Sequence, residues 1–303
     1  MTQIEFTTPV FGRNRTAELL PFRPLVDAIA RASVELEAGR IISPVRVGVP
    51  LPAMAFCCQC RRVQQISRCI SWSACVQGIP SIFGQVTVCN SETGKPEMIP
   101  DRPTLTGRRT AAVSMLGIEN LKTGAPRCVL VIGTGTQATY HIGAISEIFP
   151  GVEVLVQGGS PERAVEFSRQ LASAGLQATP VVGAIPDRVD TVITLTTCKI
   201  PVYREAARND RLLIGVGSFR PDAAEFTAEV VMASDIFVDD FHGAREESGD
   251  LLQAGVDWSA VRTLSSVIGK GVTGDRPIFF KSVGSGAWDL AAGRVAREST
   301  RGA

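Results

Sequence analysis

The chain has 303 residues, 45% of them hydrophobic, which is enough to bury a core and more than a single domain usually holds. Its 31 Lys and Arg residues nearly balance 30 Asp and Glu residues without runs of like charge, so neither nucleic acid nor an anionic membrane surface is an expected partner. Because we find neither a signal-peptide core nor an apolar run of bilayer length, we expect a cytoplasmic protein without structural disulfides.

The first part of the chain predicts short β elements between two helices. Residues 20–39 have apolar side chains near helical spacing and end on Gly39, which is typical of an amphipathic helix. Residues 43–51, SPVRVGVPL, predict a strand, and residues 81–99 predict a hairpin. The alanine and leucine spacing of residues 104–121 favours a long helix.

From residue 128 the pattern changes to short apolar segments separated by helical or loop stretches. Residues 128–132 form a continuous apolar run, as in a strand buried on both faces, and enter a glycine turn followed by helical spacing. Five more apolar segments follow, at 152–159, 178–183, 189–197, 211–218 and 235–240. This alternation predicts a parallel, doubly wound sheet.

We therefore predict an α/β fold with a doubly wound Rossmann sheet and a smaller α+β domain built from both ends of the chain. The dinucleotide-binding domain is expected over residues 120–282. Residues 1–119 would form the N-terminal part of the smaller domain, and residues 283–303 would return to it as a C-terminal helix.

Residues 133–138, GTGTQA, fit a GxGxxA motif at the predicted strand-to-helix junction. In this motif the first glycine permits a tight turn, the second lets the backbone approach a pyrophosphate, and a small third residue lets the helix pack closely. The free N–H groups at the helix N-terminus then face the phosphates. The candidate cofactor contacts in this turn are Gly133, Gly135, Thr136 and Gln137.

The choice between NADH and NADPH is open in the sequence. The next predicted strand ends in Gly-Gly-Ser, so it lacks both the carboxylate that binds ribose hydroxyls and the arginine that accepts a 2′-phosphate. Either cofactor is therefore admissible, with Gly159, Ser160 and Arg163 as candidate contacts. Thr196 and Thr197, at the end of the strand predicted over 189–197, are further candidates, although threonines at strand ends are also ordinary.

Several stretches together resemble the ornithine cyclodeaminase/mu-crystallin family, and they occur in that family's order. They are SPVRVGVPL, GIPSIFGQVTV, RRTAAVSMLG, VLVIGTGTQA, VGSFRPDAAE, EESGDLLQAGVDW and FKSVGSGAWDLAA. The resemblance implies a homodimer in which the split N- and C-terminal segments form a domain for substrate binding and dimerisation.

The resemblance also distinguishes between activities. Ornithine cyclodeaminases have a carboxylate where this chain has Phe219, and SFRPD and FKSVG look like the delta-1-pyrroline-2-carboxylate reductases. The implied reaction is NAD(P)H-dependent reduction of this cyclic ketimine, or of its six-membered homologue delta-1-piperideine-2-carboxylate, to L-proline or L-pipecolate. The implied context is proline metabolism and hydroxyproline degradation. The alternatives are an ornithine cyclodeaminase and a family member that is either non-catalytic and NAD(P)-binding or damaged by a frameshift.

Such a reduction needs a cation that holds the substrate carboxylate. Arg46 and Arg109 are the candidates, because a planar guanidinium binds carboxylate bidentately, with surface ion pairing as the alternative role. Ser282 resembles a cofactor-side contact of the family. Asp222 and Glu225 could act as acids, although capping of a helix is the favoured role.

The remaining polar residues predict no metal site. His141 and His242 are the only histidines and lack companion ligands in motif spacing, so we expect packed or surface residues. Five of the eight cysteines lie in residues 57–75, and four of them, Cys57, Cys60, Cys69 and Cys75, have the spacing C-x2-C-x8-C-x5-C. A structural zinc site usually holds its second ligand pair as tightly as its first, so zinc is disfavoured, and a redox pair is no better supported.

The cysteine-rich segment has another explanation. Between Pro52 and Gly78 the family has an apolar strand and a lysine that points into the substrate site, and this chain has neither. Cysteine and tryptophan codons begin with TG, so a frame one nucleotide upstream converts each into a codon for leucine, methionine or valine. In that frame AFCCQCR becomes Gly-Val-Leu-Leu-Ser-Met-Pro, and ISRCISWSAC can encode the lysine. We hypothesise that residues 53–77 are an out-of-frame translation.

Overall fold

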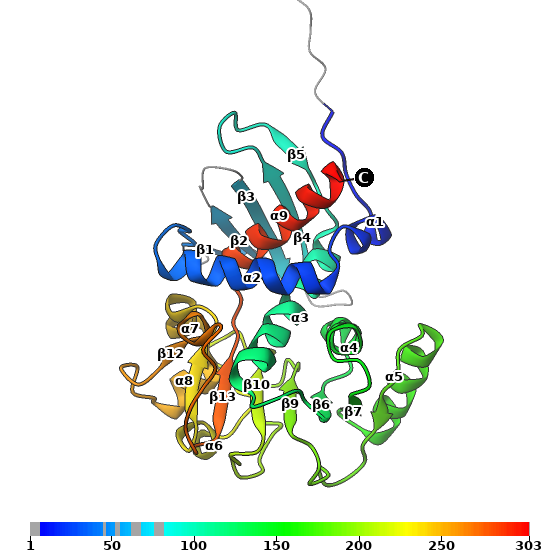
Figure 1. Ribbon diagram of the computed structural model, residues 1–303, viewed down its shortest axis with the longest axis vertical. Helices are drawn as coiled ribbons and strands as arrows, with labels where there is room; N and C mark the ends of the chain where they lie inside the picture. Colours follow the sequence, from blue (N-terminus) through cyan, green and yellow to red (C-terminus); the bar gives the residue numbers. More distant parts are fainter. Residues whose placement is uncertain (1–6, 45–46, 52–54, 62–67, 76–81, 303) are drawn as a thin grey trace, which may run out of the picture. The chain divides into compact units, whose positions relative to one another are not determined.

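The computed structural model describes residues 7–44, 47–51, 55–61, 68–75 and 82–302. Between residues 47 and 83 only the backbone is described. The chain divides into two compact units (Figure 1). Unit 1 comprises Met1–Arg109 and Gly286–Ala303, and unit 2 comprises Thr110–Ser285. The division falls inside helix α3 (Arg102–Leu121), whereas the sequence placed it at residue 120, where this helix ends.

Unit 1 contains an antiparallel sheet of five strands in the order β1-β2-β3-β4-β5. The strands are β1 (Val47–Leu51), β2 (Ala55–Arg61), β3 (Arg68–Cys75), β4 (Ile82–Cys89) and β5 (Pro96–Met98). The predicted hairpin is confirmed, because β4 pairs antiparallel with β5 and the amide of Gly94 donates to the carbonyl of Asn90 in the turn. The strand predicted in SPVRVGVPL is also confirmed, as β1.

Unit 1 also contains the helices α1 (Arg13–Glu18), α2 (Phe22–Glu37) and α9 (Gly286–Arg301) and the first half of α3. Helix α9 packs on β3 and β4, and α2 packs against α9. Gly293 makes this close approach possible, because a Cβ there would lie only 3.0 Å from a methyl group of Val88 on β4. The smaller α+β domain built from both chain ends is therefore confirmed.

Helix α2 shows why the amphipathic pattern of residues 20–39 worked as a prediction. Its apolar face buries Phe22, Leu25 and Ile29, while Val34 falls off that face and stays 43% exposed. The helix ends before Gly39, whose φ of +69° suits glycine best. An ion pair between Arg294 of α9 and Glu35, 2.8 Å apart, joins the two helices.

Unit 2 contains a parallel sheet of eight strands in the order β12-β11-β13-β10-β9-β6-β7-β8. The strands are β6 (Cys128–Ile132), β7 (Glu153–Gln157), β8 (Thr179–Pro180), β9 (Thr191–Thr194), β10 (Leu212–Gly215), β11 (Asp235–Val238), β12 (Arg262–Thr263) and β13 (Ile278–Lys281). From β6 the chain winds first towards β8 and then, through β9 and β10, in the other direction. The predicted α/β doubly wound sheet is thus confirmed.

The helices of unit 2, besides the second half of α3, follow the strands. They are α4 (Thr136–Ile148), α5 (Pro161–Ser173), α6 (Ala228–Met232), α7 (Phe241–Glu247), α8 (Gly249–Ala254) and the 3₁₀ helix η1 (Leu264–Val267). Among the described residues of the whole chain, no helix is both long and apolar enough to cross a bilayer.

The sequence missed one central strand. Strand β13 lies between β10 and β11, but it has only four residues and ends in a lysine, so it does not look like a buried strand. Lys281 is nevertheless fully buried, because its Nζ atom forms an ion pair of 2.8 Å with Asp250. A buried partner at a distance in sequence thus made a charged residue compatible with the core.

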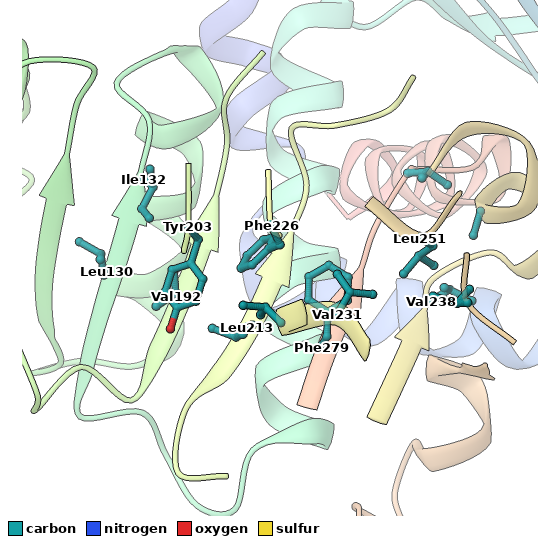
Figure 2. Close-up of a cluster of buried hydrophobic side chains, with 14 of the residues drawn as sticks. Leu130, Ile132, Val192, Tyr203, Leu213, Phe226, Val231, Val238, Leu251 and Phe279 are labelled. Atoms are coloured by element: carbon teal, nitrogen blue, oxygen red, sulfur yellow. The ribbon is translucent and has the colours of Figure 1, made fainter. Parts of the chain in front are cut away.

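Aromatic and branched side chains fill one face of the sheet of unit 2 (Figure 2). The rings of Tyr203, Phe226 and Phe279 contact one another in series, with centroids 5.3 Å and 4.9 Å apart; the first pair is tilted and the second is edge-to-face. Leu130 and Val192 of adjacent strands pack into the same cluster. Full burial of each such side chain contributes about 1.5–3 kcal/mol to the free energy of unfolding. This packing holds the strands of the sheet in place beneath the site described below.

The packing expected for the histidines is confirmed. His141 on α4 is fully buried, with its Nδ1 atom 2.8 Å from the carbonyl oxygen of Gln137 and its Nε2 atom 3.0 Å from the Ser114 hydroxyl on α3. Burial lowers the pKa of His141 from 6.5 to about 4. His242 is exposed at the start of α7.

We predict that His141 makes the protein less stable as the pH falls from about 6.5 to about 4. In this window the unfolded chain binds a proton that the folded protein does not, so the free energy of unfolding decreases by about 3 kcal/mol in total. Urea denaturation at a series of pH values measures this loss, and His141→Gln removes it. The exposed His242→Gln serves as the control and keeps the wild-type profile; an unchanged profile in His141→Gln would contradict the prediction.

Candidate functional site

Five loops of unit 2 lie together at the carboxyl edge of the parallel sheet. They follow the neighbouring strands β13, β10, β9, β6 and β7, and backbone hydrogen bonds join each to its neighbour. The strands that follow β6 are added first on one side of it, as β7 and β8, and then on the other side, as β9 and β10. In open α/β sheets ligands bind at such a switch point, here between β6 and β9, outside the carboxyl ends of the strands. The cofactor candidates of the sequence all lie in these loops or in the first turn of the helix that follows β6: Gly133, Gly135, Thr136, Gln137, Gly159, Ser160, Thr196, Thr197 and Ser282.

The glycine turn follows β6 as a tight connection to α4. Gly133 has a φ of +130° and its amide donates to the carbonyl of Gln157 at 2.9 Å. A Cβ on Gly133 would lie 2.8 Å from the carbonyl oxygen of Leu195, so the turn touches the end of β9. Only glycine fits this position in both space and backbone conformation.

The start of α4 is open to a ligand. Gly135 is the N-cap residue, its side-chain position faces no described atom within 4 Å, and the first turn of the helix contains no acidic residue. The amides of Thr136 and Gln137 lie in the first turn, where N–H groups have no partner within the helix. This arrangement can bind a pyrophosphate through N–H groups and the helix dipole.

The end of β7 presents small residues and the start of α5. A Cβ on Gly158 would lie 3.1 Å from the amide nitrogen of Ala164, so the backbone passes close to the helix. The hydroxyl of Ser160 caps α5 by accepting from the amide of Arg163. The side chain of Glu162 lies in the same turn, and its hydrogen bond with Ser160 lowers its pKa. The sequence analysis did not consider this acidic group beside the cofactor candidates.

One buried carboxylate joins the loops after β9 and β10. Glu225 accepts from the amide and hydroxyl of Thr196 at 2.7 and 2.9 Å, and from the amides of Gly217 and Ser218 at 2.6 and 3.1 Å. Burial raises the pKa of Glu225, and the nearby Lys281 ammonium and the Thr196 amide act in the opposite direction. Thr197 follows in an exposed position.

Neither carboxylate of the loop 219–225 caps a helix, so the capping role expected for them is wrong. Helix α6 has Thr227 as its N-cap residue. Asp222 is instead exposed in ion pairs with Lys199 at 2.8 Å and Arg220 at 2.9 Å. Asp222 therefore lies in a surface charge cluster, and Glu225 lies in the interior.

A second buried carboxylate organises the loop after β13. Asp239 accepts from the Ser282 hydroxyl at 2.8 Å and from the amides of Val283 and Gly284 at 3.1 and 3.0 Å. Burial and the neighbouring Asp240 raise the pKa of Asp239. The sequence analysis missed this residue, although a pair of aspartates directly after an apolar strand could have indicated it. The hydroxyl of Ser282 is thus held in one orientation.

The candidate substrate-binding arginine lies in unit 1. Arg109 on α3 donates from Nε to Asp289 on α9 at 3.0 Å, and both side chains are less than 10% exposed. No hydrogen bond occupies the two Nη groups within the described part of the chain, so they remain able to bind a carboxylate. Asp289 was also missed, although it stands out as the only charge in GAWDLAA. The other candidate, Arg46, lies outside the described residues.

Residues 73–303 match the profile of the ornithine cyclodeaminase/mu-crystallin family. The chain belongs to this family. It is 44% identical over 299 residues to the delta(1)-pyrroline-2-carboxylate/delta(1)-piperideine-2-carboxylate reductase of Azospirillum brasilense, with 96% of each chain covered. It is 28% identical to the ketimine reductase mu-crystallin of Rattus norvegicus over 73% of this chain and 71% of the relative. The family resemblance found in the sequence is therefore confirmed.

The fold of the family is also found among solved structures. The delta(1)-pyrroline-2-carboxylate reductase of Thermococcus litoralis, in complex with NADH and L-proline, superposes with a TM-score of 0.87 at 22% identity. This match covers 97% of this chain and 98% of the other. The chain therefore shares its fold with this structure.

Metal-binding groups do not gather in the described part of the chain. Within it, no three His, Cys, Asp or Glu side chains lie close enough to hold an ion. Cys128 is buried as a free thiol, and Cys198 is an exposed one. The side chains of the cysteine-rich segment 57–75, on which the zinc interpretation depends, lie outside the described residues.

We predict that the two glycines of the turn respond differently to alanine. Gly133→Ala lowers the free energy of unfolding by about 1–3 kcal/mol, because of the φ of +130° and the contact with Leu195, and it also weakens dinucleotide binding. Gly135→Ala changes the stability by less than about 0.5 kcal/mol, because its side chain meets no described atom, but it occupies space needed by the pyrophosphate. Urea denaturation and fluorescence titration with NADH and NADPH measure both effects; equal losses of stability would refute the prediction.

Proposed function

We propose that the chain is an NAD(P)H-dependent reductase of cyclic ketimines, acting on delta-1-pyrroline-2-carboxylate and on delta-1-piperideine-2-carboxylate. The observation that carries this proposal is the 44% identity, over 96% of the chain, to a relative named for both substrates. The products are L-proline and L-pipecolate. The open N-terminus of α4 supports the use of a dinucleotide, because its first-turn amides and helix dipole favour the pyrophosphate.

The cofactor side of the reaction is assigned to unit 2. The bound cofactor supplies the hydride. Gly133, Gly135, Thr136 and Gln137 hold the pyrophosphate, and Gly159 and Ser160 accept the adenosine ribose. On the other side of the switch point, Thr196, Thr197 and Ser282 contact the second half of the cofactor. Hydrogen bonds to Glu225 and Asp239 orient the hydroxyls of Thr196 and Ser282, respectively.

The substrate side is assigned to the guanidinium of Arg109. Asp289 holds Nε, which orients the guanidinium plane and leaves the two Nη groups for the substrate carboxylate. Arg109 can be buried because Asp289 balances its charge, so no buried charge is left unpaired. Arg46 is the second proposed contact to the substrate carboxylate.

Phe219 favours the reductase over the cyclodeaminase alternative. It is half-buried in the loop after β10 and has no group that can take or give a proton. Reduction tolerates this residue, because a protonated imine is already a good electrophile and the hydride completes the new C–H bond at its carbon. Cyclodeamination requires proton transfers to and from an amine, which this side chain cannot perform.

We expect purified protein to oxidise NADH or NADPH when delta-1-pyrroline-2-carboxylate is added, with proline as the product. Arg109→Lys keeps the charge but loses the bidentate geometry, so KM for the imino acid rises by about 10-fold, and Arg109→Met costs at least about 100-fold in kcat/KM. The exposed Arg169→Lys is the matched control and leaves both constants unchanged. Nicotinamide absorbance measures the rates. Ammonia release from ornithine would support the cyclodeaminase instead, and cofactor binding without turnover would support the non-catalytic alternative.

We also propose that residues 53–77 are translated out of frame. The shifted frame converts the cysteines into apolar residues and can encode the missing lysine. Resequencing of the gene is expected to reveal the frame that encodes the lysine, and protein made from that frame should exceed the chain as written by at least about 10-fold in kcat/KM. An intact frame that encodes all five cysteines would refute this proposal.

The family resemblance also leads us to propose a cytoplasmic homodimer. The buried thiol of Cys128 forms no disulfide, which suits a reducing compartment. Light scattering in solution should then give twice the chain mass of 32.3 kDa.

A further inference from the structure

The loops after β9 and β10 are joined by one side chain. Strands β9 and β10 are parallel neighbours whose register pairs Thr194 with Gly215 at their carboxyl ends. Beyond these ends the chains are no longer paired as a sheet. Glu225 bridges them, with one carboxylate oxygen bound to Thr196 and the other bound to Gly217 and Ser218.

The bridge is supported from behind by a second buried carboxylate. Asp250, at the start of α8, accepts from the amides of Glu225 and Phe226 at 2.6 and 3.0 Å. Its other oxygen pairs with the fully buried Lys281 at the end of β13. The ammonium therefore balances charge beside the two carboxylates, and the position of Glu225 is fixed through its own backbone.

The sterics of the loop agree with a fixed spacing. A Cβ on Gly217 would lie 2.1 Å from the carbonyl oxygen of Thr196, and a Cβ on Gly249 would lie 1.9 Å from the carbonyl oxygen of Ala223. The first contact shows that the loops after β9 and β10 lie as close together as backbones allow, and the second shows that the loop after β10 packs equally closely on the start of α8. Burial of a carboxylate for this purpose is costly, and an apolar side chain could fill the same space, so the hydrogen bonds themselves carry the role.

The position of the two loops indicates what they receive. The glycine turn after β6 takes the pyrophosphate, and the adenosine half lies over β7, the next strand on that side. The nicotinamide half therefore extends across the switch point, over the ends of β9 and β10.

We propose that Glu225 is a positioning residue that sets the distance between the loops at Thr196 and Gly217, and thereby shapes the site of the nicotinamide half of the cofactor. This inference rests on the dinucleotide site of the proposed function. It does not depend on which imino acid is reduced.

Glu225→Gln tests the role with little change in size. One oxygen becomes an NH₂ group, which cannot accept from a backbone amide, so one of the two loops loses its anchor. We expect the Kd for NADH and NADPH to rise by about 10- to 100-fold, while the Kd for ADP, which lacks the nicotinamide half, stays unchanged. Fluorescence titration and calorimetry of the full chain measure both.

The ligand pair separates positioning from general damage. Equal weakening of ADP and NADH in Glu225→Gln, or no weakening of either, would overturn the proposal. The matched control is Asp222→Asn, an exposed carboxylate of the same loop, which should leave both dissociation constants unchanged. If Glu225→Gln does not fold, Glu225→Asp keeps the charge but shortens the side chain, so that it cannot reach both loops, and it should weaken NADH but not ADP by about 3- to 10-fold.

The failure of this proposal is distinct from the failure of the proposed function. Wild-type protein that binds NADH without reducing either imino acid would refute the reductase, and the comparison of NADH with ADP would still decide the role of Glu225. Normal turnover with unchanged NADH affinity in Glu225→Gln would overturn the positioning role alone. Wild-type protein that binds neither ligand would overturn both.

Discussion

The site depends on a constraint of parallel sheets: at the carboxyl edge the strands separate, and their last N–H groups lose the neighbours that satisfied them. In this chain two buried carboxylates take over. Glu225 binds the amides beyond β9 and β10, and Asp239 binds those beyond β13. An unsatisfied buried N–H costs free energy comparable to a lost hydrogen bond, so these carboxylates keep the edge ordered and able to receive a ligand.

Charge balance follows from the same constraint. Carboxylates with no access to water need a cation or a set of donors, and Lys281 on the central strand β13 supplies the cation for Asp250. A charged residue thus ends a central strand beside β10, whose four residues carry no polar side chain. In unit 1 the same principle recurs with Arg109 and Asp289, where helix α9, from the end of the chain, holds an arginine encoded far earlier. Buried ion pairs therefore fix functional side chains in both units.

Family membership supports the substrate class, and the structure supports the roles of individual side chains. The 44% identity to a ketimine reductase supports a substrate class, which an open glycine turn alone could never indicate. The geometry contributes what similarity leaves open, because it orients Arg109 through Asp289 and fixes the Ser282 hydroxyl through Asp239. The hypothesis that residues 53–77 are translated out of frame rests on codons, so it concerns the gene rather than the fold.

The sequence by itself determined the fold class, the helix α2, the hairpin of β4 and β5 and the glycine turn, because each rests on a local pattern of apolar spacing or of glycine. It could not find β13, whose lysine is acceptable in the core only beside Asp250, and it misjudged Glu225 as a helix cap. Asp239 and Asp289 were missed for the same reason. The role of a buried charge is decided by the partner that tertiary structure brings to it, and no spacing along the chain encodes that partner.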